Sequence, residues 1–180
     1  MAQIGFVYST VDGHTLEICK RLAQVAETQG ASATLLELKP GVEIDLQPFD
    51  QVVIGASIRY GKHRPEVAQF IKDNIAEIES KHGAFFSVNA VARKPEKKQP
   101  HTNPYVRKFF KTITWQPAAI GIFGGKINYS MYQFWDRTMI RFIMWMTNGP
   151  TALDSNVDFT DWDEVEAFGR EICELGRLPQ

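Results

Sequence analysis

Hydroxyl residues and a glycine follow the first apolar run of the chain, Ile4–Tyr8, and a helical pattern begins among them. They are Ser9, Thr10, Val11, Asp12, Gly13, His14 and Thr15. The first turn of a helix presents free backbone N–H groups and the positive end of the helix dipole, and hydroxyl groups add further donors. Gly13 also allows a tight turn or a close approach of the backbone to a ligand. The loop therefore predicts an anion site, although an ordinary helix cap would use similar residues.

The motifs that this loop lacks narrow the kind of anion. It contains no lysine and no GxxxxGK[ST] pattern, which argues against a magnesium-bound nucleoside triphosphate. It also lacks GxGxxG, which argues against a dinucleotide. Hydroxyl and amide donors without a neighbouring cation suit a single phosphate monoester, and this is the group that we expect here.

Two later loops carry residues that suit an aromatic ligand. One consists of Ser57, Ile58, Arg59, Tyr60 and Gly61, and the other of Ser87, Val88, Asn89, Ala90, Val91, Ala92 and Arg93. Tyr60 offers a flat face for a ring, while Ser57 and Asn89 can hydrogen-bond to polar ring edges. Ordinary loop packing would also explain Tyr60 on its own. Because both loops follow apolar runs, we expect them to meet the first loop at one edge of a sheet.

Basic residues are concentrated in one part of the chain. Between residues 93 and 111 there are seven of them and one acidic residue, Glu96, so this stretch has a net charge of +6. The whole chain has a net charge of −1, which leaves −7 for the remainder. This asymmetry predicts a surface that meets something anionic, although a solvated loop and helix face would have the same composition. The seven are Arg93, Lys94, Lys97, Lys98, Arg107, Lys108 and Lys111.

The elements that must position these loops alternate between strand and helix. Apolar runs predict strands at Ile4–Tyr8, Ala33–Leu38, Gln51–Ala56, Ala84–Val88 and Ala118–Phe123. Periodic apolar positions and caps predict helices at Thr15–Gln29, Pro65–Ser80, Asn103–Ile113 and Thr160–Leu175, with Thr160 and Asp163 as an acidic capping box. Such units predict a three-layer α/β sandwich with a five-stranded parallel sheet of order 2-1-3-4-5. Ligands bind such sheets outside the carboxyl ends of the strands.

A segment of about residues 125–155 lies outside this alternation, and part of it, Ser130–Met146, predicts an extra helix. At 3.6 residues per turn its apolar side chains share one face, while Arg137 and Arg141 group on another. Stripes of this kind are common in cores, but the arginines also suit lipid phosphates. We therefore expect the helix to lie on a membrane surface, with core packing as the alternative. The stripe is Tyr132, Trp135, Met139, Phe142, Ile143 and Met146.

Length and composition favour one domain, residues 1–180, with a substantial core, because 44% of the 180 residues are hydrophobic. The net charge gives no general attraction to nucleic acid. Cys19 and Cys173 lie far apart inside helical patterns, which is typical of buried free thiols in a reducing cytoplasm. The N-terminus lacks the basic start of a signal peptide, and no apolar run is long enough to span a membrane. The four histidines lack metal-binding spacing, so no metal site is predicted.

Several segments resemble one family. The loop Ser9–Thr15 is similar to the flavodoxin phosphate loop T/S-x-T-G-x-T, with Asp12 in place of a hydroxyl residue. The sequences VVIGASIRYGKH at 52–63 and SVNAVARKPEKK at 87–98, together with the aromatic and basic spacing of Tyr132–Arg141, are more specific. They resemble the flavodoxin-type, quinone-dependent protoporphyrinogen IX dehydrogenases of bacterial haem synthesis, and the resemblance covers essentially the whole chain.

This resemblance implies a flavodoxin-like sandwich that binds FMN and oxidises protoporphyrinogen IX to protoporphyrin IX. It implies that the electrons pass to a membrane quinone, menaquinone or ubiquinone, from a peripheral position on the cytoplasmic face of the inner membrane. The three loops named above, residues 9–15, 57–61 and 87–93, are then the expected FMN contacts. Because the substrate carries two propionates, we expect basic side chains to bind it, and no general base can be named. The expected substrate-binding residues are Arg93, Lys94, Lys97, Arg137 and Arg141.

Two other functions stay open at this point. An NAD(P)H:quinone reductase would use the same fold and cofactor, and so would an electron-shuttle protein without a substrate of its own. Shuttles of this fold usually have an acidic rim, which the +6 stretch beside the expected site does not match.

Overall fold

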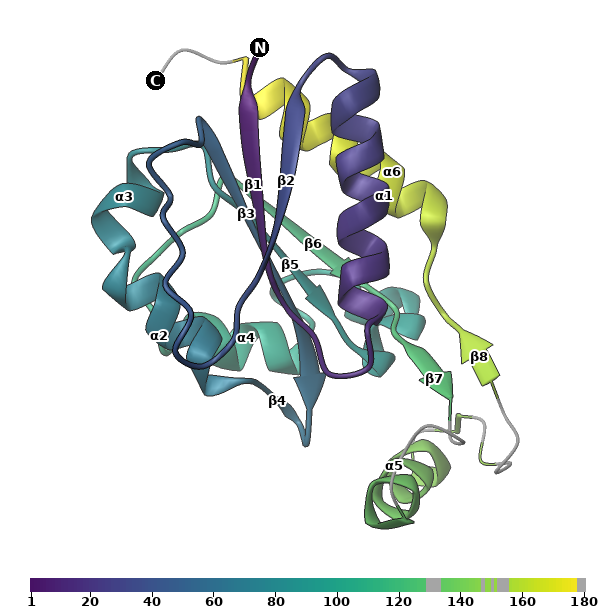
Figure 1. Cartoon of the computed structure of the whole chain (residues 1–180). Coiled ribbons are helices and arrows are strands. Elements are labelled where there is room, and N and C mark those ends of the chain that lie inside the picture. Colours follow the sequence, from purple (N-terminus) through teal and green to yellow (C-terminus); the bar gives the residue numbers. More distant parts are fainter. Residues whose placement is uncertain (129–133, 147, 150, 152–155, 178–180) are drawn as a thin grey trace.

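Five parallel strands form the central sheet. They are β1 (Gln3–Ser9), β2 (Ser32–Glu37), β3 (Gln51–Arg59), β5 (Ala84–Val88) and β6 (Ala119–Phe123). The computed structural model describes residues 1–128, 134–146, 148–149, 151 and 156–177, and it places these strands in the order β2-β1-β3-β5-β6. The five parallel strands follow the predicted order 2-1-3-4-5, but the sheet has a sixth strand that was not predicted, the two-residue β4, which pairs with β3 off this path. Figure 1 shows the carboxyl ends of the five strands together at the lower edge of the sheet.

Helices cover both faces of the sheet, which confirms the three-layer arrangement (Figure 1). One face packs against α1 (His14–Thr28) and α6 (Trp162–Leu175). The opposite face packs against α2 (Pro65–Asp73), α3 (Ile75–Glu79) and α4 (Pro104–Phe110).

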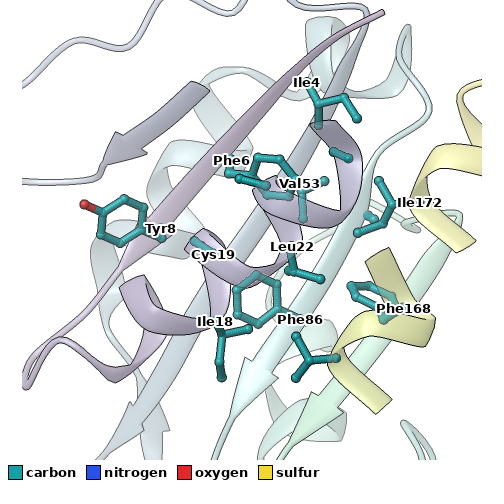
Figure 2. Close-up of a cluster of buried hydrophobic side chains, with 14 of the residues drawn as sticks. Ile4, Phe6, Tyr8, Ile18, Cys19, Leu22, Val53, Phe86, Phe168 and Ile172 are labelled. Atoms are coloured by element: carbon teal, nitrogen blue, oxygen red, sulfur yellow. The ribbon is translucent and has the colours of Figure 1, made fainter. Parts of the chain in front are cut away.

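The core follows from the alternation of side chains along each strand. Ile4, Phe6 and Tyr8 of β1 point to the α1 side, where they meet residues of α1 and α6 (Figure 2). Val7 points to the other side, and Phe86 and Phe85 of β5 divide in the same way. Each such phenylalanine contributes about 2–3 kcal/mol by burial. The two apolar layers therefore hold the strand ends, and the loops that follow them, in fixed positions.

Strand β3 is longer than the sequence predicted, since it continues past Ala56 to Arg59. Its last residues pair antiparallel with β4 (Lys62–His63), and Tyr60 and Gly61 form the turn. Their φ angles are +51° and +76°, the conformation of a two-residue type I′ hairpin. A tyrosine is rare at such an angle, so the sequence pattern gave no hairpin signal there.

Two predictions about the helices are wrong, one about continuity and one about a cap. The helix expected at Pro65–Ser80 is interrupted at Asn74, whose side-chain amide donates to the Phe70 carbonyl at 2.9 Å. The cap of α6 is Asp161 instead of Thr160, because the Asp161 carboxylate accepts hydrogen bonds from the N–H groups of Asp163 and Glu164. At α4 the predicted cap is confirmed, since Asn103 accepts from the first-turn N–H groups.

The segment after β6 begins and ends with a pair of short antiparallel strands, β7 (Lys126–Asn128) and β8 (Asn156–Asp158). Between them lies α5 (Phe134–Met146), which is the predicted extra helix from Phe134 onward. Residues 130–133 of that prediction lie outside the described residues. Figure 1 shows β7, β8 and α5 beyond the carboxyl edge of the sheet, next to the loops that the sequence picked out.

Candidate functional site

A cleft of about 1000 Å³, counting its opening to solvent, lies at the carboxyl edge of the sheet. Residues of all three predicted loops line it. They are Val11, Asp12, His14, Ser57, Ile58, Arg59, Tyr60, Gly61, Val88, Asn89, Ala90, Val91 and Arg93.

The first loop ends at a helix start that no side chain caps. Gly13 is the residue before α1, with φ +85°, and its N–H bonds to the Thr10 hydroxyl at 3.0 Å. The hydroxyls of Ser9, Thr15 and Ser57 are buried, and within the described chain they have no hydrogen-bond partner. Buried hydroxyls without partners are unusual, because each loses its bonds to water. This donor set therefore fits the single phosphate group that the sequence predicted.

The ring of His14 ties this loop to the start of α6. It is only 5% exposed, and its Nδ1 lies 3.0 Å from a Glu17 carboxylate oxygen. Its Nε2 lies 2.6 Å from the hydroxyl of Thr160, which also donates to the Gly124 carbonyl. The Thr160 hydroxyl therefore connects the first loop to the residue that follows β6. The sequence had predicted a different role for Thr160, in the cap of the last helix.

The carboxylate of Asp158 lies at the same junction, 3.8 Å from Nε2 of His14. Partial burial raises the pKa of Asp158, but hydrogen bonds from Thr160 and the neighbouring His14 outweigh this effect, so that the pKa is lowered overall. Asp158 therefore stays ionised at the edge of the first loop.

Tyr60 projects from the tip of the β3–β4 hairpin. Its side chain is 58% exposed, and the guanidinium of Arg59 lies 5.3 Å from the centre of its ring. A tyrosine that packed only within its own loop would be covered by the chain. The exposed ring instead borders the cleft.

The third loop is held from below by a chain of buried hydrogen bonds. Asn89 accepts from the N–H of Ala92 at 3.0 Å and donates to Ser87 Oγ at 3.2 Å. It also accepts from the Asn103 amide at 3.1 Å, while Ser87 Oγ lies 2.9 Å from Nε2 of His63. Asn89 lines the cleft, and these bonds use its side-chain oxygen and one of its two amide N–H groups.

His63 of this chain is buried against Phe85 and Phe109, at ring-centre distances of 5.8 and 4.6 Å. Burial lowers the pKa of His63 to about 4, so the imidazole is neutral at physiological pH. A neutral histidine can hold the Ser87 hydroxyl without placing a buried charge under the loop.

Six of the predicted cofactor residues do not line the cleft. Ser87 and Ala92 are fully buried beneath the third loop, and Ser9 and Thr15 are buried behind the first. Thr10 and Gly13 belong to the first loop itself, next to the helix start.

The predicted substrate residues are mostly outside the cleft as well. Arg93 lines it, donates to the Ala90 carbonyl at 2.9 Å and lies 6.0 Å from the centre of the Phe159 ring. Lys94, Lys97, Arg137 and Arg141 are not among the lining residues. The basic stretch therefore contributes one side chain, that of Arg93, to the cleft.

Sequence reasoning missed the wall formed by α5. Met139, Ile140 and Met144 of this helix line the cleft, and Met144 is 1% exposed and packs near Ala90 and Phe159. The other lining residues that were missed are Tyr105, Gly125 and Lys126. Helical spacing alone could have grouped 140 with 144, but it could not tell which side faced the cleft.

The outer side of α5 exposes large apolar side chains. Phe142 is 58% exposed, Trp145 67% and Met146 63%, and the Phe142 and Trp145 rings lie 6.1 Å apart. Core packing does not cover these three side chains within the chain, and Met139, at the border with the cleft, is 47% exposed. No helix in the described ranges is long and apolar enough to cross a membrane.

Comparison with known proteins identifies the family of the chain. Its residues 6–154 match the flavodoxin domain, and the chain therefore belongs to the flavodoxin family. Within it, the chain is 40% identical over 173 residues to the Escherichia coli K12 protein named protoporphyrinogen IX dehydrogenase [quinone], covering 96% of both. A Leishmania major protein of the same name is 37% identical over 170 residues, which cover 94% of this chain and 74% of that protein. The chain is thus a member of the protoporphyrinogen IX dehydrogenase [quinone] family.

Solved structures agree with the fold. A short-chain flavodoxin associated with a non-canonical PDU bacterial microcompartment has a TM-score of 0.57 and 13% identity, covering 98% of this chain and 99% of that one. A flavodoxin from the domain Archaea has a TM-score of 0.54 at 13% identity, with the same coverage. At this identity the likeness concerns the fold alone.

Proposed function

We propose that this chain oxidises protoporphyrinogen IX to protoporphyrin IX with a bound FMN and passes the electrons to a membrane quinone. The observation that carries the cofactor is the group of three buried hydroxyls without partners, Ser9, Thr15 and Ser57, beside an open cleft. The substrate and the acceptor follow from the names of the relatives at 37–40% identity. The oxidation removes six electrons, and a bound flavin can accept them in pairs or singly.

The residues around the cleft divide into two groups under this proposal. The hydroxyls and amides of 9–15 hold the phosphate at the start of α1, where the helix dipole favours an anion. The Tyr60–Gly61 hairpin and residues 89–91 would border the ring, and Arg93 is one of the cations that line the cleft. The α5 wall, through Met139, Ile140 and Met144, excludes water from the inner side of the cleft.

FMN is favoured over FAD by the form of the phosphate site. FAD would need a second phosphate and an adenosine site, and the first loop has no GxGxxG pattern for a dinucleotide. Chromatography of the flavin released from the purified protein distinguishes the two. FMN supports the proposal, and FAD contradicts it.

We further propose that α5 seats the protein on the cytoplasmic face of the inner membrane. Its exposed apolar side chains can enter the boundary between lipid headgroups and acyl chains, while the exposed Arg141 reaches lipid phosphates. A quinone dissolved in the bilayer must approach the flavin, and α5 is at once a wall of the cleft and the proposed contact with lipid. Association should be reversible, because a short amphipathic helix binds membranes weakly.

The direct test is turnover in vesicles. FMN-loaded protein, quinone-containing anionic liposomes and protoporphyrinogen IX are mixed without oxygen, and the fluorescence of protoporphyrin IX is followed. We expect repeated turnover only when quinone is present, because without it the reaction stops once the bound FMN is reduced. Quinone reduction driven by NADPH, without any oxidation of the porphyrinogen, would instead make the protein an NAD(P)H:quinone reductase.

A further inference from the structure

A second hollow, which we call the cationic groove, lies directly beside the cleft. Four basic residues from three elements line it: Lys62 of β4, Arg64 before α2, Lys72 of α2 and Lys108 of α4. No acidic residue is among its lining residues in the described chain. Lys62, Arg64 and Lys72 are close in the sequence, and the fold brings Lys108 of α4 to them.

The cations of the groove differ in what they already bind. Arg64 has partners, since its Nε lies 2.6 Å from a Glu66 carboxylate oxygen and its Nη1 donates to the Thr10 carbonyl. Lys62, Lys72 and Lys108 are exposed, and in the part of the chain that the structure describes none of them makes an ion pair. Three unpaired like charges around one hollow repel each other, and an anion that enters the groove relieves this repulsion.

The groove is continuous with the cleft. Gly61 and Tyr105 line both hollows, so the Tyr60–Gly61 hairpin forms the border between them. The floor of the groove is apolar, because Ala68 and the largely buried Phe109 contribute to it. An apolar floor with a basic rim suits a ligand that is largely apolar and carries carboxylates.

We propose that the two propionates of the porphyrinogen bind in the cationic groove to Lys62, Lys72 and Lys108, with the macrocycle extending across the hairpin toward the ring site. This inference rests on the proposed function, which supplies the substrate. The two sides of the cleft then serve different partners: the groove admits the charged porphyrinogen, and the α5 side faces the quinone. The groove replaces Lys94, Lys97, Arg137 and Arg141 as the source of most of the basic contacts.

The test compares charge removal inside and outside the groove in FMN-loaded protein. One variant carries Lys62→Gln, Lys72→Gln and Lys108→Gln. The matched control removes the same charge at three exposed lysines outside the groove, with Lys20→Gln, Lys39→Gln and Lys111→Gln. Fluorescence titrations measure the Kd of protoporphyrin IX and of its uncharged dimethyl ester, and turnover in quinone liposomes gives KM and kcat for protoporphyrinogen IX.

We expect the groove variant to raise the Kd of the diacid and the KM by about tenfold or more, with the ester bound as by the wild type. The control variant should bind both ligands like the wild type. The groove proposal is overturned if the groove variant and the control bind the diacid with equal Kd. It is also overturned if the groove variant loses as much affinity for the ester as for the diacid. If the wild type neither binds nor oxidises the porphyrinogen, the proposed function itself fails, which is a different result from wild-type activity with an unaffected groove variant.

Discussion

The two walls of the cleft are built differently. The wall at the strand ends continues directly into the core, where Val7, Phe85 and Phe86 are completely buried. The α5 wall has one fully buried side chain among those described, Met144, and its outer side exposes Phe142 and Trp145. The cofactor wall is therefore fixed by the fold, whereas the α5 wall is an addition with a second apolar side. The difference implies that the proposed membrane contact and the proposed FMN binding can be lost separately.

Replacing Phe142 and Trp145 by Ser should have the largest effect of the four changes. The effect should be confined to membrane binding by the α5 wall. Transfer of these two exposed side chains from water to the lipid interface contributes about 3–4 kcal/mol. We expect binding to anionic liposomes in a flotation assay to fall by roughly a hundredfold or more. FMN should remain bound and the unfolding midpoint should stay within a few degrees. Joint loss of FMN and of the folded state would show that α5 is part of the core.

The role of His63 beneath the third loop can be tested by the pH dependence of protein stability. His63 has a pKa of 6.5 when unfolded and about 4 in the native protein, so the unfolded chain binds the extra proton between these values. The contribution of the neutral His63 to the free energy of unfolding is therefore fully present above about pH 6.5. It falls by about 3 kcal/mol as the pH is lowered to 4. Gln at position 63 can keep a bond to Ser87 but cannot titrate.

Urea unfolding of the wild type and of His63→Gln at pH 7 and pH 4 measures this difference. We expect the variant to lose about 3 kcal/mol less than the wild type over this range. Parallel losses would mean that His63 is protonated in the native state and that its burial does not hold it neutral.

Gly13→Val combined with Thr15→Val tests the phosphate end of the cofactor wall. Valine is strained at the φ of +85° that Gly13 adopts, and the second change removes a buried hydroxyl donor. FMN affinity should fall at least tenfold, about 1.4 kcal/mol, in a fluorescence titration. Thr28→Val, at the far end of α1, is the control and should bind FMN like the wild type. Unchanged affinity in the double variant would place the phosphate elsewhere.

The smallest effect is expected from Arg93→Glu, at the border between the two walls. A cation near the ring stabilises reduced, anionic flavin, so replacing it by a carboxylate should lower the midpoint potential by a few tens of millivolts. A redox titration of the FMN-loaded variant measures this shift. A potential that rises or does not move would show that the guanidinium is directed away from the ring.

The cofactor wall could be predicted from the sequence because its signals are local. Continuous apolar runs gave the five strands, and the hydroxyl-rich segment Ser9–Thr15 preceded a helix. The hairpin at Tyr60–Gly61 was missed because two-residue β4 has no apolar alternation of its own. Strands β7 and β8 were missed for a similar reason, since each has three residues and their pairing joins segments far apart in the sequence.

The remaining errors arose where one residue had two possible partners. Thr160 has the type expected of a helix cap, but its hydroxyl bonds across the molecule to His14 and Gly124, and the neighbouring Asp161 caps the helix. Met144 lies outside the apolar stripe that helical periodicity indicated in α5, so periodicity did not assign it to the cleft. The cationic groove combines Lys62, Lys72 and Lys108, and nothing local in the sequence relates them.

The central claim is that the cleft holds a flavin that the porphyrinogen reduces and the quinone reoxidises. An anaerobic stopped-flow measurement of visible flavin absorbance tests it. At least three equivalents of FMN-loaded protein, which together accept the six electrons, are mixed first with one of protoporphyrinogen IX and then with quinone. We predict that the flavin is bleached as protoporphyrin IX forms and that quinone restores its absorbance. A flavin that protoporphyrinogen IX leaves oxidised, while NADPH bleaches it, would contradict the account.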